Sequence, residues 1–322
     1  MLNLKKVLYL TMDDVKAIGF SDEDFINCVS DIFVQYGQGQ AQPLPKLGTK
    51  ISPSKSFHVA SGWVKKSKTS GVKWASSFAT KSNGGLNPNA GVIILNDTTY
   101  GLPKAIMDAF YISVKCTAAS YAVFASFYAK KDADVLSLLG VSHQALHNVR
   151  AIRLILNQLR EIRIYDANLG EAKRFAQSVE DEFHGSVIVC STVEEALENT
   201  NVVLATEMIP KKQLTRIADK WLPRAGVFIA TTGLARFEGE TISRMDKIIV
   251  DGLRHSAILG NAPVYADQGE VSVGSKCGRE SAHENIIIIN NGLVVQEIYI
   301  GSKMYDSAKE KGIGLELAPI TW

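Results

Sequence analysis

The chain has 322 residues, of which 46% are hydrophobic and 21% are charged, and its formal net charge at pH 7 is +2. This length predicts two domains, and a near-neutral chain without a basic run is not expected to bind nucleic acid. No apolar run reaches the roughly 18 residues of a membrane span, and the N-terminus lacks the apolar core and cleavage site of a signal peptide. Four scattered cysteines without metal-ligand spacing predict a reduced, cytoplasmic protein with no metal site.

The first part of the chain predicts a helix, several short strands and a second helix. Apolar residues recur at helical spacing over 22–37, after two acidic residues at the start. Strand-like runs follow at 56–64, 72–79 and 91–95, and turn residues separate them. A long apolar helix is predicted at 113–130, where many small residues permit close helix packing.

From Val135 onward the pattern changes to alternating strands and helices. Strands are predicted at 135–139, 162–165, 187–190, 202–205, 227–231 and 247–250, and helices fill most of the gaps. This alternation is typical of a doubly wound parallel sheet.

The end of the chain returns to the first domain. A last strand is predicted at 286–289 and a helix at about 293–311, and we expect the final apolar tail to pack on the first domain. We therefore predict a dinucleotide-binding domain at 130–290, inserted in a domain made of 1–129 and 291–322.

A glycine loop follows the first strand of the alternating region. Gly140 ends that strand, a helix is predicted over 142–159, and the second strand ends in Asp166. In a dinucleotide-binding unit the helix N-terminus binds the pyrophosphate, and an acidic residue after the second strand accepts hydrogen bonds from the adenosine ribose. The pattern G-x-G-x-x-G/A is incomplete, because Ser142 stands at its second glycine while Ala145 suits its third position. Serine adds one CH2OH group, whose hydroxyl can donate to phosphate, so we favour a dinucleotide site over a βαβ unit without a ligand.

Several residues around this loop are candidates for cofactor contacts. A carboxylate at Asp166 suits the free 2′-hydroxyl of NAD and repels the 2′-phosphate of NADP, so we expect NAD rather than NADP. Thr206 and Thr231 end strands and so lie at the carboxyl edge, where cofactors bind. His143, beside Gln144, has three interpretations: it caps the helix, contacts phosphate or faces solvent, and we favour solvent.

An ordered set of segments resembles the ornithine cyclodeaminase/mu-crystallin family over residues 20–312. The set includes Gly71-Val72-Lys73-Trp74, Gly101-Leu102-Pro103-Lys104, Thr117-Ala118-Ala119, Gly140 with Gln144-Ala145, Val250-Asp251 and Gly292-Leu293. The resemblance implies a Rossmann domain inserted in an α+β substrate-binding and dimerisation domain. It also implies a homodimeric enzyme that uses NAD(P) at the α-carbon of a small amino or imino acid.

Within this family, residues 73–78 and 95–97 look most like the N-(2-amino-2-carboxyethyl)-L-glutamate dehydrogenase branch. The resemblance implies that Lys73 contacts the substrate carboxylate and is the central catalytic residue. Lys46 is a candidate for a second positive charge, and His58 is a further candidate for the substrate site. The resemblance also makes Thr117 a candidate cofactor contact, beside the residues of the glycine loop.

The chain departs from the family at five positions. Cys116 stands where many members have an arginine that binds the substrate carboxylate, and a thiol cannot make that bidentate contact. Leu234 stands where ornithine cyclodeaminase has its catalytic aspartate, and leucine cannot transfer a proton. Pro88 replaces a small residue at the cofactor, and Ser142 replaces the loop glycine. In addition, Glu297 replaces a usual aspartate near the start of the last helix.

These observations lead to one main hypothesis and two alternatives. We expect an NAD-dependent amino-acid dehydrogenase, imine reductase or opine-like condensing enzyme, with secondary-metabolite or siderophore biosynthesis as an analogy for its pathway. The first alternative is a degenerate member that binds a small ligand or nucleotide without redox turnover. The second is ornithine cyclodeaminase itself, which the replacements at Cys116 and Leu234 disfavour.

Overall fold

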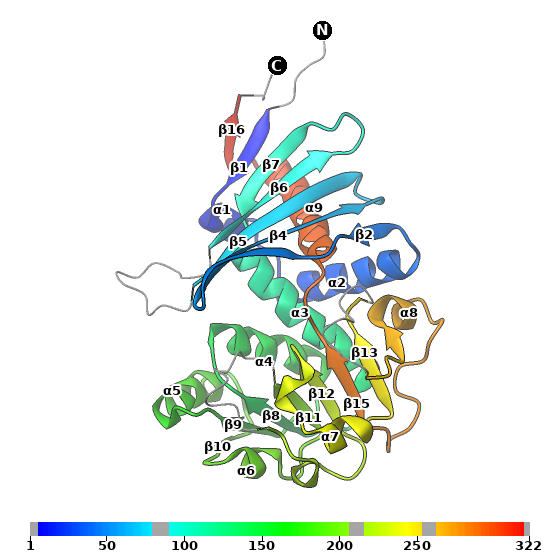
Figure 1. Ribbon diagram of the computed structural model, residues 1–322. Helices are drawn as coiled ribbons and strands as arrows, with labels where there is room; N and C mark the ends of the chain where they lie inside the picture. The colour runs from blue at the N-terminus through cyan, green and yellow to red at the C-terminus, as the bar shows by residue number, and fades with distance from the viewer. Residues whose placement is uncertain (1–5, 79–89, 206–215, 253–261, 319–322) are drawn as a thin grey trace. The chain divides into compact units, whose positions relative to one another are not determined.

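The computed structural model describes residues 6–78, 90–205, 216–252 and 262–318 (Figure 1). The chain forms two compact units: unit 1 comprises residues 1–116 and 293–322, and unit 2 comprises residues 117–292. The boundary falls inside helix α3 (Phe110–Tyr128) rather than after it, where the sequence pattern placed it. A continuous apolar helix carries no turn residues that would reveal this boundary.

Unit 1 is built on an eight-stranded sheet with the order β16-β1-β7-β6-β5-β4-β2, and β3 also pairs with β4. The strands are β1 (Val7–Leu10), β2 (Ala41–Pro43), β3 (Leu47–Ser52), β4 (Lys55–Val64), β5 (Thr69–Phe78), β6 (Gly91–Asp97), β7 (Pro103–Asp108) and β16 (Leu315–Leu317). Only β1 and β7 pair in parallel among these described strands; the other pairs are antiparallel. The predicted tail thus returns to unit 1 as strand β16 beside β1.

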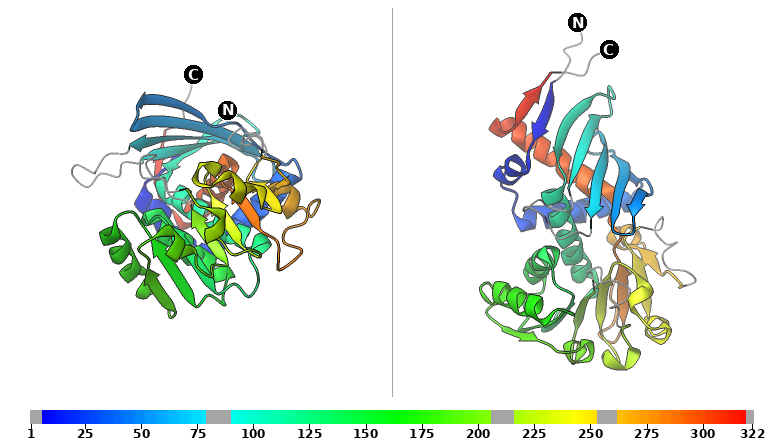
Figure 2. Two further views of the ribbon diagram at one scale, coloured as in Figure 1. Left: turned by 60° about the horizontal axis from the view of Figure 1, so that its bottom comes forward. Right: turned by 60° about the vertical axis from the view of Figure 1, so that its left-hand side comes forward.

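Helix α9 (Val294–Lys311) covers one face of this sheet (Figure 2). It packs on β2, β4, β5 and β6 and on helix α2 (Asp22–Gly37), and the short helix α1 (Met12–Ala17) contacts β1 and β7. Two glycines allow the close approach, because a Cβ at Gly62 would meet Val295 Cγ1 at 2.8 Å and a Cβ at Gly71 would meet Ile298 Cγ1 at 3.1 Å. Side chains on this face of β4 and β5 therefore point toward α9.

Unit 2 is an eight-stranded sheet in which every neighbouring pair is parallel, with the order β10-β9-β8-β11-β12-β15-β13-β14. Its strands are β8 (Val135–Leu139), β9 (Glu161–Tyr165), β10 (Ser186–Val189), β11 (Val202–Ala205), β12 (Phe228–Thr231), β13 (Lys247–Val250), β14 (Ala266–Asp267) and β15 (Ile286–Ile289). From β8 the chain runs to β9 and β10 on one side and then to β11 and β12 on the other. This reversal confirms the predicted doubly wound fold and places its switch point between β8 and β11.

Besides the greater part of α3, the described α-helices of unit 2 are α4 (His143–Ile155), α5 (Leu169–Glu180), α6 (Val193–Leu197), α7 (Gly239–Ser243) and α8 (Gln268–Ser272). Helix α4 ends earlier than the predicted residue 159, because Leu156 leaves the helical conformation at φ −98° and ψ 77°. The core strands match the predicted positions closely because each is a run of mostly apolar and mostly buried residues.

Candidate functional site

The glycine loop lies at the carboxyl edge of the unit 2 sheet, beside the switch point. Gly140 has φ +99°, in the left-handed region that favours glycine, and its N–H donates to the Tyr165 carbonyl at 2.8 Å. Ser142 is the N-cap of α4, and its Oγ accepts from the Ala145 N–H at 3.1 Å. The serine at the family's glycine position is thus part of the helix start, and its hydroxyl hydrogen can still donate to an anion.

Asp166 lies next to this loop at the end of β9. Its carboxylate accepts from the Val141 N–H at 3.0 Å and from the Asn168 N–H at 2.8 Å. A carboxylate has about four acceptor positions on its two oxygens, so these bonds fix its orientation and leave capacity for ribose hydroxyls. The structure therefore brings the predicted acidic residue and the predicted glycine loop together.

The other predicted cofactor residues differ in their surroundings. Gln144 donates to Asn148 Oδ1 at 2.8 Å, and His143 is exposed with its ring 4.8 Å from that of His147. Thr231 is fully buried, and its hydroxyl lies 3.0 Å from the Ala205 and Gly233 carbonyls. Buried in this way, Thr231 holds the turn after β12.

Two further positions complete the predicted cofactor set. Thr117 is the first residue of unit 2 and is half-buried in α3. Thr206 lies outside the described residues, as does Pro88 among the departures from the family.

The predicted substrate lysine is found in a polar cluster in unit 1. Lys73 on β5 makes a close ion pair with Glu297 on α9, and its Nζ is 3.4 Å from Ser113 Oγ. Ser113 on α3 donates to Glu297 Oε1 at 2.6 Å. The Lys73 side chain is only 19% exposed and that of Glu297 only 7%, so this strand lysine does not face water. We name Lys73, Glu297 and Ser113 the lysine cluster.

Glu297 was not among the predicted site residues, although the sequence contained a signal for it. The first turns of α9 are buried throughout, and a carboxylate among such residues needs a partner. That partner, Lys73, is 224 residues away in the sequence, so only the fold identifies it.

Cys116 lies next to the lysine cluster, one helical turn after Ser113, and is 2% exposed. Burial raises the pKa of its thiol well above the usual value, and the negative charge of Glu297 raises it further, while Lys73 opposes the shift. The thiol is therefore a packed, protonated side chain, and it does not replace the positive charge of the family's arginine.

His58 and Lys46 bring two more basic groups toward Lys73. In the β4–β5 register His58 pairs with Ala75 and Lys73 pairs with Ala60, so His58 and Lys73 are diagonal neighbours on the α9 face. Burial lowers the pKa of His58, and the positive charges of Lys46 and Lys73 lower it further. His58 Nε2 also lies 3.1 Å from Ser56 Oγ. Lys46 itself is exposed, just before β3.

Leu234 stands at the position that the resemblance assigns to the catalytic aspartate of ornithine cyclodeaminase. It begins the short 3-10 helix Leu234–Arg236 after β12 and packs against the apolar core of unit 2. Glu238 and Glu240, the nearest carboxylates along the chain, are exposed. At the position that the resemblance assigns to the cyclodeaminase aspartate, the chain therefore carries a packed leucine side chain, which cannot transfer a proton.

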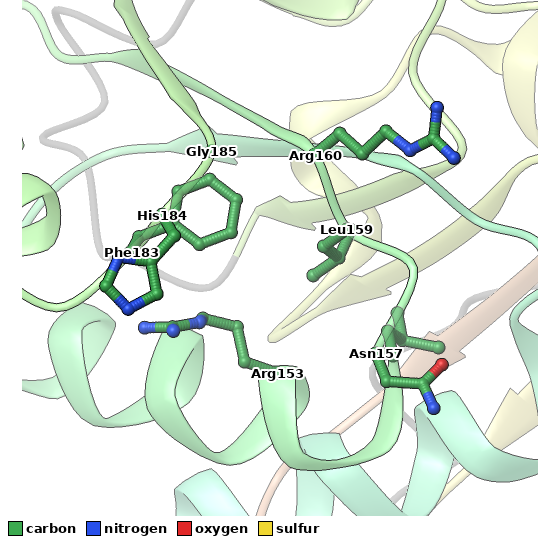
Figure 3. A pocket seen from close by; sticks show the side chains of 8 residues that line it. Arg153, Asn157, Leu159, Arg160, Phe183, His184 and Gly185 are labelled. Atoms are coloured by element: carbon green, nitrogen blue, oxygen red, sulfur yellow. The ribbon is translucent and has the colours of Figure 1, made fainter.

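A surface pocket of about 420 Å³ lies at the opposite, amino edge of the unit 2 sheet (Figure 3). Its lining residues precede β9 and β10: Arg153, Leu156, Asn157, Leu159, Arg160, Phe183, His184 and Gly185. Arg153 donates to the Glu182 carbonyl at 2.7 Å and lies over the Phe183 ring, while the Arg160 side chain points away from both. Dinucleotides bind at the carboxyl edge of such sheets, so this pocket is not the candidate cofactor site.

Two general findings apply to the described ranges alone. Within them, no group of three or more His, Cys, Asp or Glu side chains is arranged to hold a metal ion. None of the helices in that part of the chain has both the length and the apolar character to cross a membrane.

Comparison with known proteins identifies the family. The sequence model of the ornithine cyclodeaminase/mu-crystallin family matches residues 5–312. The alanine dehydrogenase of Archaeoglobus fulgidus is 26% identical over 97% of this chain and 98% of its own. A solved structure described as an archaeal alanine dehydrogenase dimer with bound NAD has a TM-score of 0.86 and 26% identity, covering 97% of this chain and 99% of its own.

The opine-type branch is also among the relatives. The N-((2S)-2-amino-2-carboxyethyl)-L-glutamate dehydrogenase of Staphylococcus aureus is 25% identical over 77% of each chain. That similarity does not exceed the similarity to alanine dehydrogenase, so the comparisons do not favour the opine-type branch over the others. The family model spans both units and nearly the whole chain, and the chain therefore belongs to the ornithine cyclodeaminase/mu-crystallin family.

Proposed function

We propose that this protein is an NAD-dependent oxidoreductase that acts at the α-carbon of an amino or imino acid. The observation that carries the proposal is the joint placement of Gly140, Ser142 and Asp166 at the switch point of a doubly wound sheet. The alanine dehydrogenase and opine-type dehydrogenase among its relatives act on substrates of this class by name.

The residues at the carboxyl edge fit a dinucleotide. The first N–H groups of α4 and the Ser142 hydroxyl would hold the pyrophosphate, since a helix N-terminus favours negative charge. Asp166 would accept hydrogen bonds from the adenosine ribose and would repel the extra phosphate of NADP. Bound NADH would supply the hydride, and the protein would contribute mainly by positioning.

The lysine cluster fits the substrate. Lys73 offers a positive charge for a carboxylate, and Glu297 offers a negative charge for a protonated amine or imine nitrogen. Imine reduction requires a hydride at carbon and a proton at nitrogen, and the Lys73 ammonium and Ser113 hydroxyl are the proton-bearing groups of the cluster. A small α-amino acid or its imine carries both charges that this pair complements.

We further propose that two copies of the chain associate through the open face of the unit 1 sheet. Leu47, Ile51 and Trp74 on this sheet are 66%, 61% and 45% exposed, and Phe57 stacks on Trp74 at 5.5 Å. In the β4–β5 register these rings lie on the face opposite Lys73, away from α9. An apolar sheet face that none of the described helices of unit 1 covers needs a partner, and the similar archaeal alanine dehydrogenase structure is described as a dimer.

Turnover tests the proposed function directly. The purified protein is incubated with NADH and a panel of cyclic imines, or of 2-oxo acids with ammonia or an amino acid, and NADH oxidation is followed. We expect oxidation with at least one carboxylated imine and its loss in Lys73→Ala. If NADH binds and no compound of the panel is reduced, the result favours the alternative hypothesis of a degenerate family member that binds a nucleotide without redox turnover. If the Lys73→Ala variant still oxidises NADH with the same compound, the lysine cluster is not the substrate site.

A further inference from the structure

Arg236 places a buried positive charge at the carboxyl end of β8. It is the last residue of the 3-10 helix after β12 and is 7% exposed. Its Nη1 donates to the Leu139 carbonyl at 3.3 Å, and Leu139 is the residue before Gly140. The guanidinium therefore lies against the start of the glycine loop, on the β12 side of the switch point.

Together with other contacts, Arg236 fixes three consecutive residues of the loop. Arg236 holds the Leu139 carbonyl, the Tyr165 carbonyl holds the Gly140 N–H at 2.8 Å, and Asp166 holds the Val141 N–H at 3.0 Å. The loop thus has an acidic group on the β9 side and a basic group on the β12 side. A loop held in this way keeps its N–H groups oriented before a ligand arrives, which reduces the ordering cost of binding.

The backbone that carries Arg236 is itself fixed. The Ile217 N–H donates to the Arg236 carbonyl at 2.6 Å, and the Thr231 hydroxyl lies 3.0 Å from the Gly233 carbonyl. These bonds tie the turn after β12 to the sheet and to a neighbouring segment. The guanidinium is therefore carried by a rigid part of unit 2.

We propose that Arg236 is a positioning residue for the dinucleotide loop and that its charge favours ligands bearing a pyrophosphate. The inference rests on the proposed NAD site. A buried charge is weakly screened, so it acts over a longer distance than an exposed one and favours an anion at the nearby N-terminus of α4. Arg236 would thus support phosphate binding in a loop where Ser142 stands at the second glycine position.

The test compares two ligands that differ only in their phosphates. ADP and adenosine displace bound NADH, and the displacement is followed by nucleotide fluorescence for the wild type, Arg236→Met and Arg236→Lys. Arg244→Met is the matched control, because Arg244 is also partly buried in unit 2 and contacts Asp219 and the Pro223 and Arg224 carbonyls rather than a residue of the glycine loop. Circular dichroism checks that each variant is folded.

We expect Arg236→Met to weaken ADP binding about tenfold, which corresponds to about 1.4 kcal/mol, while adenosine binding changes less than about twofold. Arg236→Lys should retain most of the preference for ADP, and it supplies the comparison if the methionine variant does not fold. The control should leave the ratio of ADP to adenosine affinity unchanged.

Two outcomes would overturn the inference. An equal loss of ADP and adenosine binding in Arg236→Met, or an unchanged ratio in both Arg236 variants, would show that Arg236 has only a structural role. Failure of the wild type to bind NADH or ADP would contradict the proposed NAD site as well, so the two failures are distinguishable.

Discussion

At the residue scale, the ion pair between Lys73 and Glu297 is the feature that most changes the interpretation of the substrate site. The family resemblance implies a lysine that meets a carboxylate from the substrate, whereas here a carboxylate of the protein already neutralises it. A substrate carboxylate must therefore share Lys73 with Glu297 or displace it. This arrangement favours substrates that bring a positive nitrogen for Glu297 together with their carboxylate.

The same pair has a consequence for stability. Removing one member of a buried ion pair leaves an uncompensated charge, so we expect Lys73→Met to lower the free energy of unfolding by about 3 kcal/mol. The double variant Lys73→Met with Glu297→Gln should recover most of that loss, because no buried charge remains unpaired. Urea unfolding of the two single variants and the double variant measures this coupling. Additive effects in the cycle would show that the two side chains do not interact.

His58 gives a test of the basic groups around Lys73. Its pKa is lowered by burial and then by Lys46 and Lys73, so the imidazole should titrate below the ordinary histidine value. Lys46→Met should raise the pKa of His58, while Lys55→Met, which changes an exposed lysine of the same β-hairpin on the opposite face of the sheet, should leave it unchanged. Histidine NMR titration reads the pKa of His58 in each variant.

The pKa of His58 also fixes the sign of its contribution to stability. Because the folded state disfavours protonation of His58, the unfolded state binds more protons between the lowered pKa and the ordinary one. Stability should therefore fall as the pH falls through this window. The loss of stability over this pH window should be smaller in His58→Gln than in the wild type. An equal loss in the two proteins would contradict a lowered pKa of His58.

At the element scale, helix α4 tests the role of the serine at the family's glycine position. Ser142 caps the helix, so Ser142→Ala should lower the free energy of unfolding by about 1 kcal/mol, whereas Ser142→Gly should cost only a few tenths. Ser178→Ala, in an exposed part of α5, is the control and should cost less than the alanine change at the cap. If Ser142→Ala and Ser178→Ala have the same unfolding midpoint, Ser142 is not the cap.

The elements also show which parts of the fold the sequence can predict. The core strands of unit 2 and helices α2 and α9 were predicted to within about two residues, because each has continuous burial or a clear helical period. Strands β1, β2 and β7 were not predicted, because they are defined mainly by their neighbours in the sheet. Strand β1, for example, lies between β7 and β16, which is formed more than 300 residues later.

The candidate sites also contain contacts that the sequence can predict and contacts that it cannot. The glycine loop and Asp166 could be predicted from one continuous βαβ pattern, because the residues concerned are close in sequence. The contacts of Lys73 with Glu297 and of Arg236 with Leu139 could not, because each joins residues that only the fold brings together. Sequence spacing alone carries no information about such pairs.

At the scale of the whole molecule, the open apolar face of the unit 1 sheet predicts a homodimer. Trp74→Glu should convert the dimer to a monomer, because a charge replaces an exposed ring at the centre of this face. Leu154→Glu, at an exposed apolar position on α4 of unit 2, is the matched control and should remain dimeric. Light scattering coupled to size-exclusion chromatography gives the mass. A monomeric wild type would contradict the proposed association.

The central claim is that the carboxyl edge of unit 2 binds NAD(H), and direct titration with NADH and NADPH, followed by nucleotide fluorescence, tests it. We predict micromolar binding of NADH and binding of NADPH at least about tenfold weaker, because Asp166 repels the 2′-phosphate. Asp166→Asn should bring the affinities for NADH and NADPH closer together. Failure to bind either nucleotide would contradict the account and favour a family member that has lost its cofactor.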